Sequence, residues 1–118
     1  MNKIYYLASC DTCRKIIKAM PQGHNLVFHD IKQDPITEEQ LDEMHQLSGS
    51  YEALFSKKAQ LYKSLGLKDK ALTEADFKKY ILEHYTFLSR PGFIIDGAIY
   101  IGNSQLNILK VHNALRNV

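Results

Sequence analysis

The sequence predicts an α/β domain with a helical insert. Three observations support this fold class: a strand–helix–strand order at the start, helical patterns over about residues 34–87, and two strands followed by a helix at the end. A chain of 118 residues has the usual size of one domain, and with 45% hydrophobic and 24% charged residues its composition is ordinary for a globular protein. We therefore expect a single domain over 1–118 in which insert and sheet share one core.

The N-terminal segment predicts a βαβ unit. Residues 3–7 (KIYYL) are β-branched and aromatic, which is typical of a strand, and residues 25–31 (NLVFHDI) predict a second one. Between them, apolar residues recur at helical spacing until Pro21 and Gly23 end the run; they are Cys13, Ile16, Ile17 and Met20. Two strands joined by one helix are expected to lie parallel.

Three helices are predicted in the insert. Residues 36–47 open with a capping box, Thr37 and Gln40, and residues 72–88 open at Thr73 with Asp76 as a weaker partner. Residues 53–67 (ALFSKKAQLYKSLGL) predict the helix between them, closing near Gly66. The expected apolar faces, in chain order, are Leu41, Met44 and Leu47; Leu54, Leu61 and Leu65; and Phe77, Tyr80, Ile81 and Tyr85.

The chain ends with a predicted hairpin and helix. Asp96-Gly97 separates two β-rich runs, 93–95 and 98–101, and this dipeptide favours the type I′ turn of a tight hairpin. Ser104 is expected to cap the last helix, whose predicted apolar face is Leu106, Leu109, Val111 and Leu115. The sheet should therefore contain four strands.

Composition and charge exclude several classes of protein. A net charge of +2 does not indicate direct nucleic-acid binding, and no apolar run approaches the ~20 residues of a membrane span. Two cysteines are too few for a disulfide-stapled secreted scaffold, so we expect a cytoplasmic protein. Residues 30–43 are acidic and residues 51–80 are rich in lysine, which indicates either solvated helix faces or a protein-docking surface.

Both cysteines stand three residues apart in "SCDTCRK", and this spacing has three interpretations. Half of a zinc site would need two more ligands, but there is no third cysteine and the histidines are scattered: His24, His29, His45, His84 and His112. Buried filler is the second interpretation, because Cys13 falls on the apolar face of its helix. A redox dithiol is the third.

The position of Cys10 favours the dithiol. Cys10 lies where the first strand meets the helix, and the unpaired N–H groups and dipole of a helix start stabilise a thiolate. Arg14 and Lys15 add positive charge, which Asp11 opposes. Because Cys13 lies one turn further on, it can attack a mixed disulfide formed on Cys10. We therefore predict that Cys10 attacks and Cys13 resolves.

A second candidate site is "LSRPGFII". Pro91 either simply starts the third strand or forms a cis peptide that brings its backbone against the dithiol. Arg90 beside it offers a planar pair of donors to an oxyanion or a thiolate.

These motifs, together with "SKKAQLYKSLGL" in the insert and "FLSRPGFIIDGAIYIG", give the chain a resemblance to the glutaredoxin-like arsenate reductase/Spx (ArsC-like) family over essentially its whole length. The resemblance implies a thioredoxin/glutaredoxin-like fold, a four-stranded mixed sheet with an inserted helical subdomain, and a cis peptide at Pro91. It also makes Cys10 the family's nucleophile and Arg90 the arginine before that proline.

The resemblance implies further ligands and also departures. It places Thr12, Arg14 and Pro91 beside the substrate or anion. Arsenate reductases of this family hold the oxyanion with three arginines, of which Arg90 matches one. The insert arginine falls at Lys58, with the neighbouring lysine, Lys57, as the nearest competitor; the third has no counterpart, since Asn103 stands nearest to its place.

Two functions follow from the resemblance. The first is a thiol-dependent reductase of uncertain substrate, recycled by glutathione, glutaredoxin or thioredoxin and without a bound cofactor or metal. The second is an Spx-like regulator in which a dithiol switch controls binding to RNA polymerase; a family remnant with an idle site is the third interpretation. In each case we expect a cytoplasmic monomer that contacts neither membrane nor nucleic acid directly.

Overall fold

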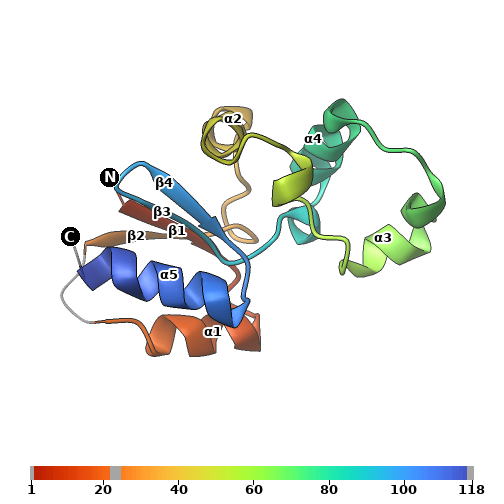
Figure 1. The fold of residues 1–118 in the computed structure, drawn as a ribbon. Helices are drawn as coiled ribbons and strands as arrows, with labels where there is room; N and C mark the ends of the chain where they lie inside the picture. The colour runs from red at the N-terminus through yellow and green to blue at the C-terminus, as the bar shows by residue number, and fades with distance from the viewer. Residues whose placement is uncertain (1, 22–24, 117–118) are drawn as a thin grey trace. The chain divides into compact units, whose positions relative to one another are not determined.

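The computed structural model describes residues 2–21 and 25–116, which form two compact units (Figure 1). Unit 1 combines the described residues of the N-terminal part, up to Asp34, with those from Arg90 onward. Unit 2 is Pro35–Ser89, close to the expected insert of 34–87. The expectation that both units share one core stays a prediction.

Unit 1 contains the predicted four-stranded mixed sheet. Its strands are β1 (Asn2–Tyr6), β2 (Leu26–Asp30), β3 (Gly92–Ile95) and β4 (Ala98–Ile101), in the order β2-β1-β3-β4. β1 and β2 are parallel, whereas β3 is antiparallel to both β1 and β4. Asp96 and Gly97 have φ angles of 50° and 78°, which confirms the expected turn with two positive φ values.

Two helices of unit 1, α1 (Asp11–Lys18) and α5 (Gln105–Arg116), cover one face of this sheet (Figure 1). Between these helices and the sheet lies a hydrophobic core, whose buried residues are Ile4, Met20, Phe93, Ile95, Val111 and Leu115. The predicted stop of α1 involved Gly23, which lies outside the described residues; the helix itself ends at Lys18.

The start of α5 is as predicted, but half of its predicted apolar face is wrong. The Ser104 hydroxyl accepts a hydrogen bond from the Asn107 N–H at 3.1 Å. Leu106 and Leu109, however, are 62% and 56% exposed. The helix face that packs on the sheet contains Val111 and Leu115, and Leu106 and Leu109 lie outside that face.

Unit 2 is helical, and both predicted capping boxes are present. Its elements are α2 (Glu38–Ser48), η1 (Glu52–Leu54), α3 (Gln60–Ser64), η2 (Leu67–Asp69), α4 (Glu74–Glu83) and η3 (Tyr85–Phe87). At the start of α2, the side chains of Thr37 and Gln40 each accept a hydrogen bond from the other residue's backbone N–H, as those of Thr73 and Asp76 do at the start of α4. On α2, Leu41 and Met44 are buried but Leu47 is not.

The predicted helix over 53–67 is wrong in its first half. Phe55 is extended and pairs with Leu88 in a β-bridge, and the Ser56 N–H donates to the Phe87 carbonyl at 2.7 Å. Burial of the Phe55 ring, which stacks on Phe87 at 5.2 Å, therefore overrides helix propensity, and α3 begins only at Gln60. Of the predicted face, Leu54 is buried, Leu61 is half-buried and Leu65 is exposed.

The predicted helix over 72–88 is also shorter than expected. α4 ends at Glu83, and Tyr85 belongs to the separate turn η3. Glu74, the first residue of α4, fixes the turn at 50–52. Its carboxylate accepts hydrogen bonds from the N–H groups of Tyr51 and Glu52, at 2.7 and 3.0 Å, and from the Ser50 hydroxyl at 3.2 Å.

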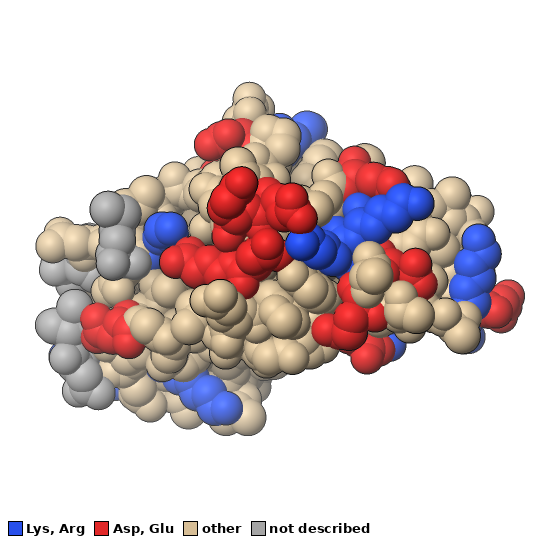
Figure 2. Space-filling view, turned by 90° about the horizontal axis from the view of Figure 1, so that it is seen from above, with Lys and Arg blue, Asp and Glu red and all other residues tan. Residues whose placement is uncertain are grey.

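Several lysines of unit 2 form ion pairs with acids of the same unit. Lys78 lies 2.7 Å from Glu38 and 3.1 Å from Asp42, and its ammonium group is 5.7 Å from the centroid of the Tyr51 ring. On the face drawn in Figure 2, basic side chains likewise border a group of acidic ones. The charge of these lysines is therefore partly neutralised within the unit.

Candidate active site

The sheet of unit 1 brings the two predicted motifs to the same edge. Cys10 follows the end of β1 and occupies the N-cap of α1, with extended backbone angles. Tyr5, near the end of β1, lies opposite Gly92, the first residue of β3, so the segment before β3 meets the segment after β1. The Arg90–Pro91 peptide is cis, which confirms the expectation from the resemblance.

Cys10 is half-buried, and its surroundings favour the thiolate. Desolvation is the largest single influence and raises its pKa, but it is outweighed by the N–H groups of Cys13 and Thr12, by the Cys13 thiol and by the charge of Arg90. Together they hold the pKa of Cys10 below its ordinary value. The sulfur of Cys10 is thus stabilised at the start of α1, as predicted.

Cys13 has the opposite character. It is completely buried in α1, and desolvation, the largest cause, raises its pKa to about 11. The negative charge of the Cys10 sulfur and its contact with Cys13 also raise the pKa of Cys13, whereas the Leu7 backbone and the charge of Arg90 lower it. Cys13 therefore stays protonated at neutral pH, and its S–H stabilises the ionised form of Cys10. A half-buried sulfur whose ionised form is stabilised, with a buried thiol behind it, is an arrangement suited to nucleophilic attack followed by resolution.

Arg90 and Pro91 complete this part of the site. The charge of Arg90 lowers the pKa of both cysteines, which places its guanidinium within electrostatic reach of the two sulfurs. Pro91 is buried, and its carbonyl accepts a hydrogen bond from the Gly102 N–H at 2.9 Å. The cis peptide is thereby fixed between the first residues of β3 and the segment that follows β4.

Arg14 and Thr12 differ in what they contribute. The Arg14 guanidinium donates to the Ala8 carbonyl at 2.9 Å and forms an ion pair with Asp11, so these two groups already engage it. Thr12 acts on Cys10 through its backbone N–H, while its side chain is exposed. Binding of a substrate anion by either residue stays a prediction.

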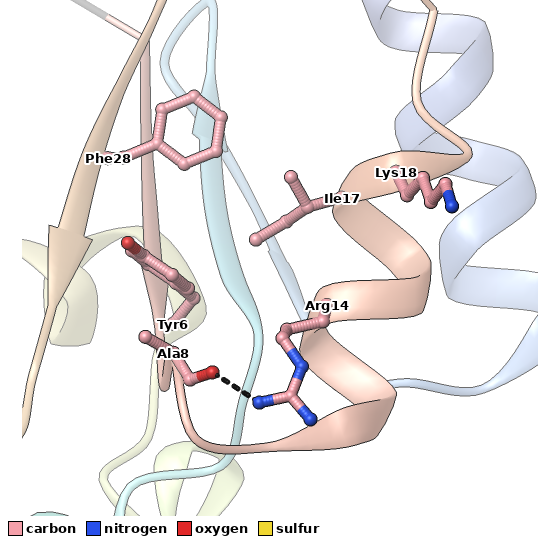
Figure 3. A pocket seen from close by; sticks show the side chains of 6 residues that line it. All are labelled: Tyr6, Ala8, Arg14, Ile17, Lys18 and Phe28. Carbon is pink, nitrogen blue, oxygen red and sulfur yellow. Dashed lines mark hydrogen bonds between the residues drawn. The ribbon is translucent and has the colours of Figure 1, made fainter.

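An open pocket of about 340 Å³ lies beside the loop that carries Cys10 (Figure 3). Tyr6 and Phe28, in edge-to-face contact at 5.8 Å, form one wall, and Ile17 points toward them from α1. Arg14, whose guanidinium donates to the Ala8 carbonyl, lies at one end of the pocket. No sequence pattern predicted this contact between Arg14 and the backbone of Ala8.

The two candidate lysines of the insert are distinguished by their partners. Lys57 pairs with Glu52 at 2.9 Å, which raises its pKa, whereas Lys58 is exposed and has no ion pair among the described residues. Lys58 is thus the freer cation, and its role toward an anion stays a prediction. Asn103, nearest to the place of the family's third arginine, is exposed.

No metal site and no membrane span is found in the part of the chain that the structure describes. Within residues 2–21 and 25–116, no three His, Cys, Asp or Glu side chains are grouped as metal ligands would be. His24, considered as a zinc ligand above, lies outside the described residues. None of the described helices combines the length and the hydrophobicity that crossing a bilayer requires.

Comparison with known proteins identifies the family. The family model described as "ArsC family" matches residues 5–111. The chain belongs to the ArsC family. This confirms the resemblance noted in the sequence, although a search of curated proteins gave no match.

Solved structures with the same fold as this ArsC-family chain include the following, each at 23% sequence identity. Arsenate reductase from Vibrio cholerae superposes with a TM-score of 0.78 over 93% of this chain and 96% of its own. An arsenate reductase (ArsC) related protein from Brucella melitensis gives 0.69 over 89% and 88%, and a protein from Staphylococcus aureus COL gives 0.75 over 93% and 97%. The predicted α/β fold of the thioredoxin/glutaredoxin-like class is thereby confirmed.

Proposed function

We propose that this ArsC-family protein is a thiol-dependent oxidoreductase in which Cys10 attacks the substrate and Cys13 resolves the covalent intermediate. The observation that carries the proposal is the contrast between the two sulfurs. Cys10 is half-exposed with a lowered pKa, and Cys13 is buried behind it with a pKa raised to about 11. A pair with this asymmetry divides the work of attack and release between two groups.

The first step consumes the thiolate. The sulfur of Cys10 attacks one sulfur of a substrate disulfide, forms a mixed disulfide and releases the other half of the substrate as a thiolate. The N–H groups of Thr12 and Cys13 and the charge of Arg90 stabilise the attacking anion before this step. They lower the pKa of Cys10 and so raise the fraction of molecules that are ready to attack.

The second step uses Cys13. Once Cys10 is in a mixed disulfide, its negative charge is gone, and that charge is one of the causes that raise the pKa of Cys13. Cys13 loses its proton to solvent and its sulfur attacks the sulfur of Cys10. The Cys10–Cys13 disulfide forms, the second substrate thiolate leaves, and two electrons have passed from the protein to the substrate.

A disulfide substrate fits these residues better than arsenate does. A tetrahedral oxyanion is best held by planar, bidentate guanidinium groups. Here Arg90 is the one arginine at the family's positions, Arg14 is engaged by Asp11 and Ala8, and a lysine and an asparagine stand where the resemblance places the other two arginines. The sulfur chemistry, in contrast, needs only the dithiol and its local electrostatics.

Trapping of the mixed disulfide tests the proposal. Cys13→Ser should accumulate a covalent adduct with a disulfide substrate such as oxidised glutathione, because resolution is removed while attack is retained. Cys10→Ser should form no adduct and show no turnover with either a disulfide or arsenate. Intact-mass spectrometry measures the adduct, and full activity of the Cys10→Ser variant would reject the assignment.

The redox-switched adaptor, which would bind RNA polymerase through a lysine-rich insert, has less support. Lys57, Lys78 and Lys79 pair with acids of unit 2, at 2.9, 2.7 and 3.9 Å for the nearest oxygens. The insert therefore presents fewer free cations than its composition indicates. The same dithiol would serve either role, and a pull-down with oxidised and reduced protein separates them.

A further inference from the structure

The exposed side of α5 carries an apolar and basic stripe that the fold leaves uncovered. Leu106, Leu109, Lys110 and Asn113 follow one another at helical spacing and so share one face of α5. All four are exposed to solvent, and the two leucines are more than half exposed. Neighbouring large apolar side chains on a surface typically indicate an interaction site.

The layer formed by α1 and α5 is strongly basic. The two helices carry five basic side chains against one acid, which is Asp11; the basic residues are Arg14, Lys15, Lys18, Lys110 and Arg116. Because Asp11 pairs with Arg14, the other four cations have no acid on either helix to neutralise them. Of these cations, Lys110 lies on the same face as the two leucines, and the layer as a whole favours a partner with negative charge.

The topology of unit 1 places the leucines at the same end as the nucleophile. β1 and β4 run in the same direction because each is antiparallel to β3. α1 follows β1 and α5 follows β4 on the same face of the sheet, so the two helices begin at the same edge (Figure 1). Leu106 and Leu109 lie in the first turns of α5, at the edge where Cys10 caps α1.

From these three observations we infer that α5 is the docking surface for a protein dithiol that returns the protein to its reduced form. This inference rests on the proposed function and names its electron donor as a protein, of the thioredoxin or glutaredoxin type, with an acidic and apolar surface around its own cysteines. A small thiol such as glutathione needs no such surface. Transient redox complexes are small, so a patch of two leucines flanked by charges is of the right scale.

The recycling step balances as a dithiol–disulfide exchange. One thiolate of the donor attacks the sulfur of Cys10, the accessible end of the Cys10–Cys13 disulfide, and Cys13 leaves as a thiolate that takes a proton. The second thiolate of the donor then attacks the donor sulfur of the mixed disulfide and releases Cys10 as a thiolate. The donor ends as a disulfide, and its two electrons have reduced the pair.

The experiment measures reduction of the Cys10–Cys13 disulfide itself, with no substrate present. Diamide-oxidised protein is mixed with reduced thioredoxin, reduced glutaredoxin, glutathione or dithiothreitol, and free thiols are counted by alkylation and mass spectrometry over time. In the wild type, at least one of the two proteins should act faster than glutathione at equal thiol concentration. For that protein, Leu106→Ser/Leu109→Ser should lower the second-order rate about tenfold. Reduction by dithiothreitol should not change.

A charge variant and a matched control complete the design. Lys110→Glu leaves the leucines in place and should lower the rate with the protein donor, and added salt should lower the wild-type rate in the same way. Leu65→Ser/Lys68→Glu makes the same kinds of change on an exposed leucine and lysine of unit 2 and should have no effect. Its rate with the protein donor falling as far as that of the α5 variants would overturn the placement on α5.

Three other outcomes also reject the inference. Glutathione reduces the wild type at least as fast as both thioredoxin and glutaredoxin do, both proteins reduce the α5 variants at the wild-type rate, or the α5 variants lose as much rate with dithiothreitol as with the protein donor. None of them bears on substrate attack by Cys10, which the adduct of the Cys13→Ser variant reports separately.

Discussion

Cys10 and Cys13 are expected to differ widely in their rate of alkylation by iodoacetamide. With a pKa of about 11, Cys13 is a thiolate in about one molecule in 3,000 at about pH 7.5. The pKa of Cys10 lies below its ordinary value of 9.0, so more than about 3% of its sulfur is ionised at the same pH. Because the thiolate is the reactive species, Cys10 should be labelled at least about 100-fold faster.

The perturbation that tests the cause is Arg90→Gln, which removes a charge that lowers the pKa of Cys10. The pH dependence of Cys10 labelling should move to higher pH in this variant. Arg116→Gln is the matched control: it removes an equal charge from the last turn of α5, away from the edge where Cys10 caps α1, so the profile should stay close to that of the wild type.

The assay is limited labelling at a series of pH values, followed by peptide mass spectrometry that assigns the label to each cysteine. Equal rates at the two cysteines would refute the electrostatic reasoning. So would an Arg116→Gln shift as large as that of Arg90→Gln, because the site would then respond to net charge alone.

Three predictions concern stability and are checked by urea unfolding. Glu74→Ala should cost about 1–2 kcal/mol, a value reduced for solvent screening, because its carboxylate holds the turn at 50–52. The N–H groups of that turn lower the pKa of Glu74. The stabilisation by its carboxylate is therefore present above the ordinary pKa of 4.5 and is lost as the pH falls through the folded-state pKa. A Glu74→Ala penalty that persists in acid would contradict this. Val111→Ala should cost about 2 kcal/mol because Val111 is fully buried, whereas Leu109→Ala on the exposed face should change stability by less than about 0.5 kcal/mol. Because the pKa of Cys13 is raised, its neutral form contributes fully to folding stability below pH 9.0. The free energy of unfolding of the wild type should therefore fall by about 2 kcal/mol relative to that of Cys13→Ala between about pH 9 and pH 11. Parallel pH profiles of the two proteins would disprove this.

Elements defined by local chemistry were predictable from the sequence. The Thr37 capping box, the Asp96-Gly97 turn and the strands on either side of α1 depend on neighbours within a few residues, and the structure contains each of them. The position of Cys10 at a helix start followed from the same local signals.

The errors arose where distant contacts decide. Phe55 has helical neighbours in the sequence, but its bridge to Leu88 joins positions more than 30 residues apart and keeps it extended. On α5, periodicity allowed more than one apolar stripe, and only the sheet determines that Val111 is inside and Leu109 outside. At the site, the pairing of Arg14 with both Asp11 and the Ala8 carbonyl likewise depends on the folded loop.

The N-cap of α1 also has a consequence for how strongly the disulfide takes up electrons. Ser, Thr, Asp or Asn would normally cap a helix at this point, but here Cys10 occupies the N-cap and its side chain makes no capping hydrogen bond. The neighbouring N–H groups and the charge of Arg90 instead lower the pKa of its sulfur. Whatever stabilises the thiolate stabilises the dithiol form of the protein relative to the oxidised form. At pH values above the pKa of Cys10, this raises the reduction potential of the pair relative to the same dithiol without these interactions, so the Cys10–Cys13 disulfide is more readily reduced.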